Sequence, residues 1–131
     1  MREADWFFSS LTVLQSADFE MAEDDDIYRM GVMAQFSVTF ELAWKALRAV
    51  LQLYGVDADT ESCRKILGLD SRLGFLQNPE RWFRMMEERN TCLHVYDENE
   101  ANELVVLIRN RFLPAFTQLE TTLQENNQRS H

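Results

Sequence analysis

The longest apolar pattern in the chain, residues 26–54, sets the strongest limit on the fold. Apolar side chains recur there at steps of three and four residues, which is the spacing of one helical face. Further apolar residues widen this face into a broad arc, and such a helix is usually buried by neighbours on more than one side. The pattern therefore predicts a long central helix. The first set is Phe36, Phe40, Ala43, Leu47, Val50 and Tyr54; the second is Val32, Met33, Trp44 and Leu51.

Three other segments predict helices that surround the central one. Residues 2–21 carry one apolar stripe at helical spacing, and residues 60–69 suit a short helix. The pair Asn78-Pro79 is a strong start signal, with Asn as the N-cap and Pro at the first helical position. We expect the helix that begins there to run to about Leu93.

The last helix is predicted to begin at Asp97, which forms a capping-box pattern with Glu100. Pro114 should kink this helix or tighten it locally. No strand-length alternation is present. We therefore expect an all-α fold, an up-and-down antiparallel four-helix bundle with one extra short helix. A single domain is expected over residues 1–125, with a frayed polar tail over residues 126–131.

The composition limits the compartment and the partners. The net charge of −9 argues against nonspecific binding along a nucleic-acid backbone, although it leaves room for a small basic site. Residues 1–20 carry charged and polar residues throughout, unlike a secretory signal, and no apolar run is long enough for a membrane span. Cys63 and Cys92 are therefore expected to be reduced thiols in the cytoplasm. The acidic run at 23–26 is interpreted as a solvated turn and helix start, and no metal site or cofactor is predicted.

Arg89 lies on the apolar side of the predicted fourth helix. It follows Trp82 by seven residues, so the two side chains are about 20° apart around the helix axis. Burying an unpaired guanidinium costs several kcal/mol. Arg89 must therefore meet a carboxylate, extend to solvent, or face a cleft or subunit interface. Glu41 and Glu87 are the candidate carboxylates.

His94 follows Arg89 by five residues, and the pair has two interpretations. An Arg that holds phosphate through its fork of donors, with a His that moves a proton near neutral pH, suits cleavage of an RNA phosphodiester. A helix that ends near Leu93, or a two-fold dimer, would bring the two together. Alternatively, both residues simply complement the dipole and the free carbonyls of a helix C-terminus.

Two segments carry a resemblance to a known family: "FSVTFELAWKALRAVLQLYG" (36–55) and "RWFRMMEERNTCLHVYDE" (81–98). Over roughly residues 5–120 the chain resembles the HEPN group found beside minimal nucleotidyltransferases, also described as nucleotidyltransferase substrate-binding proteins. The resemblance rests on an Arg, four intervening residues and a His, together with "FELAWK" upstream.

This resemblance implies a helical homodimer with its motifs facing each other. Some members are toxins of two-gene toxin–antitoxin modules and act as metal-independent ribonucleases, and their Arg and His correspond to Arg89 and His94. Asn90 matches a polar residue that typically follows the Arg. In one subgroup a tyrosine follows two residues after the His, here Tyr96, and the partner nucleotidyltransferase adds AMP to it and silences the toxin.

Several alternatives stay open at this point. Arg84 is a candidate basic contact for substrate, or only a solvated surface charge. The chain is expected to be either a ribonuclease toxin acting on RNA, or a noncatalytic subunit that holds a nucleotide or other substrate for a separate nucleotidyltransferase. The acidic composition slightly favours the second. A helical adaptor without a phosphate site is the third possibility.

Overall fold

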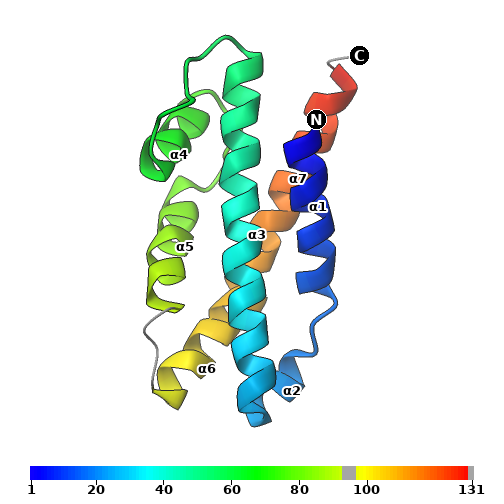
Figure 1. The fold of residues 1–131 in the computed structure, drawn as a ribbon, viewed down its shortest axis with the longest axis vertical. Helices are drawn as coiled ribbons and strands as arrows, with labels where there is room; N and C mark the ends of the chain where they lie inside the picture. The colour runs from blue at the N-terminus through cyan, green and yellow to red at the C-terminus, as the bar shows by residue number, and fades with distance from the viewer. Residues whose placement is uncertain (93–96, 130–131) are drawn as a thin grey trace.

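The computed structural model describes residues 1–92 and 97–129, and within these ranges every regular element is helical (Figure 1). The predicted all-α fold class is confirmed. In chain order the elements are α1 (Arg2–Gln15), α2 (Phe19–Asp24), α3 (Asp26–Leu53), α4 (Cys63–Arg72), α5 (Pro79–Cys92), α6 (Glu98–Leu107), the π-helix η1 (Ile108–Phe112) and α7 (Leu113–Arg129). Two short separate helices, α2 and α4, are present where one was predicted.

The 28-residue helix α3 lies at the centre, as its broad apolar arc predicts. Figure 1 shows α1 and α7 on one side of it and α4 and α5 on the other, and α1, α2, α4, α5 and α6 all pack against it. Tyr54 was predicted as the last member of the apolar stripe, but it lies after the helix and is exposed. Gly55 follows with φ 83°, a conformation that favours glycine at a helix C-terminus.

The first predicted helix, residues 2–21, is two helices in the structure. Asp18 is the N-cap of α2, and its carboxylate accepts hydrogen bonds from the backbone N–H groups of Glu20 and Met21. This local capping bond interrupts the apolar periodicity on which the single helix was predicted. The acidic run performs the same role for α3, because the carboxylate of Asp25 accepts from the Tyr28 N–H at 2.9 Å.

The last helical stretch contains a π-helical turn just before Pro114. In η1 the N–H of Leu113 donates to the carbonyl of Ile108, five residues earlier. The sequence predicted a kink or a tightened turn, whereas the structure has a widened one. A widened turn accommodates a proline that lacks an N–H and whose ring would clash with the carbonyl four residues earlier. Helix α7 continues to Arg129, beyond the predicted end of the domain at residue 125.

Aromatic side chains join the central helix to α5, η1 and α7. Phe36 stacks on Phe112 with ring centroids 5.3 Å apart. Trp82 meets Phe116 edge to face at 5.5 Å and also lies 6.1 Å from Phe40. All five rings are fully or almost fully buried. Packing of Trp82 against Phe40 fixes the rotation of α5 relative to α3, and this rotation positions Arg89 two turns further along α5.

Candidate functional site

Arg89 forms an ion pair with Glu41 that joins α5 to α3. The Arg89 Nη1 donates a hydrogen bond to Oε2 of Glu41 at 2.8 Å. The arginine side chain is 25% exposed and the glutamate 40%, so the pair lies at the edge of the core. Of the two carboxylates that the sequence offered, Glu41 is the one that meets Arg89. The guanidinium is neither unpaired in the interior nor free in solvent.

The aromatic face of Phe40 packs against the guanidinium of Arg89. The central carbon of the Arg89 guanidinium lies 5.1 Å from the centroid of the Phe40 ring, which is buried. A cation over an aromatic face is attracted by the ring quadrupole and held in a fixed plane. Since Phe40 also packs on Trp82, the core itself determines the orientation of the arginine.

Glu41 is held by two further side chains of α3. The Trp44 indole N–H donates to Oε2 at 3.0 Å, and Lys45 Nζ lies 3.4 Å from Oε1. Partial burial raises the pKa of Glu41, but the Trp44 hydrogen bond and the charges of Lys45 and Arg89 outweigh it. The net result is a pKa below the ordinary value of 4.5. Glu41 is therefore ionised at neutral pH and suited to orient Arg89.

A surface groove opens beside this pair, and we name it the Arg89 groove. Its volume is about 360 Å³, and it runs between α3 and the C-terminal part of α5. Asn90, predicted as a substrate-binding residue, is exposed and lines this groove. The lining residues are Ser37, Val38, Glu41, Leu42, Arg89 and Asn90.

The other predicted site residues are placed differently. His94 and Tyr96 lie outside the described residues, in the segment between Cys92 and Asp97. Arg84 does not line the Arg89 groove; its Nε donates to Oε1 of Glu88 at 2.9 Å on the surface of α5. The structure therefore favours the interpretation of Arg84 as a surface charge.

The two cysteines are free thiols in the structure. Cys63 lies at the start of α4, close enough to Arg89 and Glu41 for both charges to affect the pKa of its thiol. Burial outweighs them and raises its pKa to about 11. Burial also raises the pKa of Cys92. Both therefore stay protonated at neutral pH, which suits packing rather than nucleophilic attack.

Sequence reasoning missed the groove lining contributed by α3. Ser37 and Val38 lie one turn before Glu41, Leu42 follows it directly, and Val38 is half exposed although it is apolar. The positions of these residues can be read from the sequence. An apolar arc this broad, however, does not indicate which of its residues pack against neighbouring helices and which are exposed to solvent. The supporting roles of Phe40 and Trp44 were also missed, because both fit a core assignment equally well.

A comparison with protein families gives a match. The model of the family described as nucleotidyltransferase substrate binding protein like matches residues 6–125, which includes both the Arg89 groove and the segment with His94 and Tyr96. No curated protein matches the chain in sequence. No helix among the described residues is long and apolar enough to cross a membrane. The chain belongs to the nucleotidyltransferase substrate binding protein-like family.

Proposed function

We propose that this protein is the toxin of a two-protein module, a metal-independent ribonuclease whose activity a partner nucleotidyltransferase silences. Arg89 and His94 are the catalytic residues in this proposal, and the active form is a homodimer in which two Arg89 grooves face each other. The resemblance of the 81–98 segment to HEPN proteins supports the proposal, as does the family's link to nucleotidyltransferases.

The observation that carries the proposal is the fixed orientation of Arg89 at the rim of its groove. Glu41 engages Nη1, and the Phe40 ring fixes the plane of the guanidinium. In the proposed complex a phosphate binds at Nε and Nη2, on the other edge of the guanidinium from the contact with Glu41. A preorganised guanidinium is a good ligand for a phosphodiester, because no reorientation is needed when charge develops on the phosphate.

The proposed reaction is a transesterification within RNA. The 2′-hydroxyl of one nucleotide attacks the adjacent phosphorus, its proton passes to His94, and the bond from phosphorus to the 5′-oxygen breaks. The protonated His94 then gives this proton to the leaving 5′-oxygen, which yields a 2′,3′-cyclic phosphate and a 5′-hydroxyl and returns the histidine to its neutral form. Arg89 binds the nonbridging oxygens and stabilises the added negative charge. No net water or redox partner is consumed.

Tyr96 would be the point of control. The partner transfers AMP from ATP to the tyrosine oxygen, and pyrophosphate leaves. The added phosphate places negative charge two residues from His94, where it repels an incoming RNA phosphate and occupies Arg89. The modification would therefore block binding and catalysis together.

Cleavage of RNA by the purified protein and its variants tests the proposal. We expect His94→Ala to abolish the cleavage, and Arg89→Lys to reduce it by about 100-fold because lysine lacks the planar fork. Arg72→Lys is the matched control and should keep full activity, since Arg72 is exposed in the last turn of α4 and does not line the groove. Unchanged cleavage by His94→Ala would refute the catalytic assignment.

A noncatalytic subunit is the second candidate, and the ion pair itself favours it. Glu41 already neutralises much of the Arg89 charge, and the chain carries a net charge of −9, so its field is poor for collecting RNA. In that case the groove binds one nucleotide phosphate for the partner enzyme. Absence of RNA cleavage by the wild-type protein, combined with a stable complex with the nucleotidyltransferase, would select this candidate.

A further inference from the structure

A second and larger groove lies next to the Arg89 groove. It has a volume of about 640 Å³ and lies between the N-terminal half of α3, the end of α5 and the start of α6. Ser37 lines both grooves. We name this second site the acidic groove, because Asp26 on one wall and Asp97 and Glu98 on the other contribute carboxylates.

The floor of the acidic groove is apolar. Met30 and Met33 line it on the α3 side, and Ala101 lines it on the α6 side. Met30 is 67% exposed, and Ile27, one turn earlier on α3, is 83% exposed. Methionine-rich apolar surface with a polar rim is typical of sites that bind a partner helix. Met33 and Ala101 are themselves buried, so the apolar side chains of the groove that are exposed are Met30 and Ala34.

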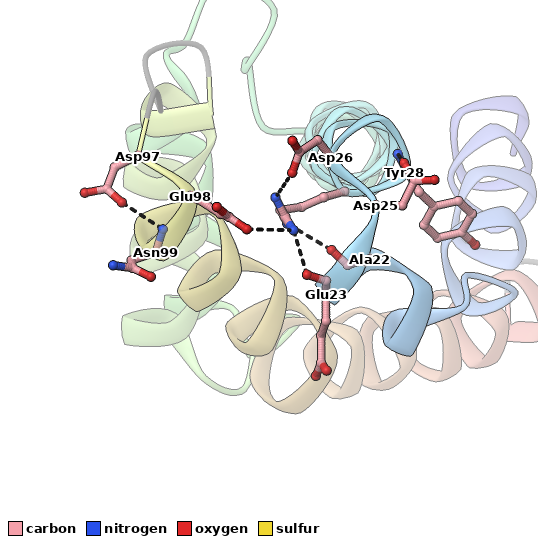
Figure 2. A network of polar contacts seen from close by, with 9 residues as sticks. Ala22, Glu23, Asp25, Asp26, Tyr28, Asp97, Glu98 and Asn99 are labelled. Carbon is pink, nitrogen blue, oxygen red and sulfur yellow. Dashed lines mark hydrogen bonds and ion pairs between the residues drawn. The ribbon is translucent and has the colours of Figure 1, made fainter.

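Arg29 links the two walls of the acidic groove through the carboxylates of Asp26 and Glu98, both of which Figure 2 labels. Its side chain is 4% exposed and donates to the carbonyls of Ala22 and Glu23 at the end of α2, at 2.9 and 2.7 Å. It also pairs with Asp26 at 2.7 Å and with Glu98 at 3.7 Å. The guanidinium is thus fully engaged, so it offers no free positive charge to a ligand.

The charge of the groove is therefore negative. Three carboxylates line it against one guanidinium, and the exposed residues Glu23, Asp24 and Asp25 add to the negative field on the same side. A second copy of this chain would bring a similarly acidic surface, and like charges across an interface are repelled. A partner surface with lysine and arginine side chains beside an apolar ridge complements the groove better than a second acidic copy does.

The acidic groove also borders the segment that contains His94 and Tyr96. Cys92 precedes that segment and Asp97 follows it, and both residues line the groove. A protein that docks here contacts Cys92 and Asp97, the two residues between which the proposed substrate tyrosine lies in the sequence. Docking and modification would then be parts of one binding event.

We infer that the acidic groove is the docking site for a basic amphipathic helix of the partner nucleotidyltransferase. This inference rests on the proposed function, since it identifies where that partner binds. The apolar face of the helix covers Met30 and Ala34, and its lysines or arginines pair with Asp26, Asp97 and Glu98. The carboxylates provide orientation and a fast association rate, while the apolar floor provides most of the affinity.

Binding of the purified partner, measured by calorimetry with full-length proteins, tests this inference. We expect Met30→Glu and Glu98→Lys each to weaken the complex by about tenfold or more. The matched controls are Leu53→Glu, equally exposed at the other end of α3, and Glu100→Lys, in the same first turn of α6. Both controls should bind as the wild type does. Affinity should fall when salt rises from about 0.05 to about 0.5 M. Far-UV circular dichroism of each variant confirms folding.

Three outcomes of these measurements would refute the docking site. Wild-type affinity in Met30→Glu and Glu98→Lys would refute the docking site while leaving the proposed partnership intact. Loss of self-association in Met30→Glu, measured by sedimentation of the protein alone, would show that a second copy covers the groove and would also refute it. No complex between the wild-type proteins would refute the partnership, and the docking site with it.

Discussion

Trp44 and Arg89 donate hydrogen bonds to the same atom, Oε2 of Glu41, at 3.0 and 2.8 Å. One donor comes from α3 and the other from α5. A carboxylate fixed by an indole on its own helix cannot rotate freely, so it holds the arginine of the neighbouring helix in one orientation. The C-terminal end of α5 is thereby attached to the centre of the molecule just before the segment that contains His94.

Replacing Glu41 by Gln should therefore loosen Arg89 and destabilise the fold. We expect a loss of about 1 kcal/mol in the free energy of unfolding, because the pair is only partly buried. Urea denaturation at neutral pH measures it. Lys45→Ala removes the weaker, more exposed contact and should cost less. An equal loss in both variants would contradict the central role of the Arg89 contact.

The same pair predicts a pH dependence. The pKa of Glu41 is lowered in the folded protein, so the carboxylate contributes stability above its ordinary pKa of 4.5. That contribution is lost as the pH falls through the lowered value. The stability difference between wild type and Glu41→Gln should accordingly shrink in acid. A difference that stays constant over the acidic range would argue against ionic pairing.

Asp70 offers a pH dependence of the opposite sign. Its side chain is fully buried in α4, and neither carboxylate oxygen has a hydrogen-bond partner among the described residues. Burial raises its pKa from 3.8 to about 8. Between these values the folded protein keeps a proton that the unfolded chain has released. Stability should therefore fall as the pH rises through this window, by up to about 1.4 kcal/mol per pH unit.

Asp70→Asn should remove that slope. We expect the variant to match the wild type in free energy of unfolding near pH 4 and to be more stable near pH 8. The amide of Asn is neutral at every pH, whereas the buried acid must either keep its proton or become charged in the interior. Urea denaturation at several pH values measures the difference. Asp57→Asn, at an exposed position, serves as the control and should follow the wild-type curve. Parallel curves for wild type and Asp70→Asn would disprove the raised pKa.

Tyr96→Phe should separate catalysis from its control. The phenylalanine keeps the ring but lacks the oxygen that would receive AMP, so the variant should cleave RNA and stay active with the nucleotidyltransferase and ATP. Mass spectrometry of the wild type should show the added AMP under the same conditions. If the wild type gains no AMP, or if the variant is silenced equally well, Tyr96 is not the control point.

Arg29→Ala should lower the stability of the fold more than replacement of a surface arginine by alanine does. Arg29 is almost completely buried and satisfies two carbonyls at the end of α2, so its removal leaves polar groups without partners. We expect a loss of about 3 kcal/mol in the free energy of unfolding, measured with urea. Arg48→Ala, which removes a cation over the Trp44 ring, should cost about 1 kcal/mol or less. Similar losses in the two variants would show that the α2 carbonyls find other partners.

The sequence predicted the helices well where one signal dominated. Asn78-Pro79 placed the start of α5, and the long apolar arc placed α3 almost to the residue. The break between α1 and α2 was missed because the apolar spacing continues past Asp18, whose capping bonds interrupt the helix. Thr60 was taken as the start of α4, but Ser62 caps it, since its hydroxyl accepts from the Lys65 N–H.

The candidate site was predictable in part. Helical geometry showed that Arg89 had to meet a carboxylate, a cleft or solvent, and it named Glu41 among the partners. The contact between residues 48 positions apart could not follow from spacing, because it depends on how α5 rotates when Trp82 packs on Phe40. The buried role of Arg29 was not foreseen either, since an arginine after an acidic run also suits a solvated surface.

The π-helical turn at residues 108–112 affects how the length of this chain can vary. A wide turn holds one residue more than the α-helical turn that would replace it. Deleting one residue there would close the turn and leave α6 and α7 in the same rotational phase. A deletion elsewhere in α7 would rotate all later residues by about 100° and turn Leu123 away from the interior. The turn is therefore a place where this chain can lose a residue without rebuilding its core, provided that Pro114 is also replaced by a residue that fits an α-helical turn.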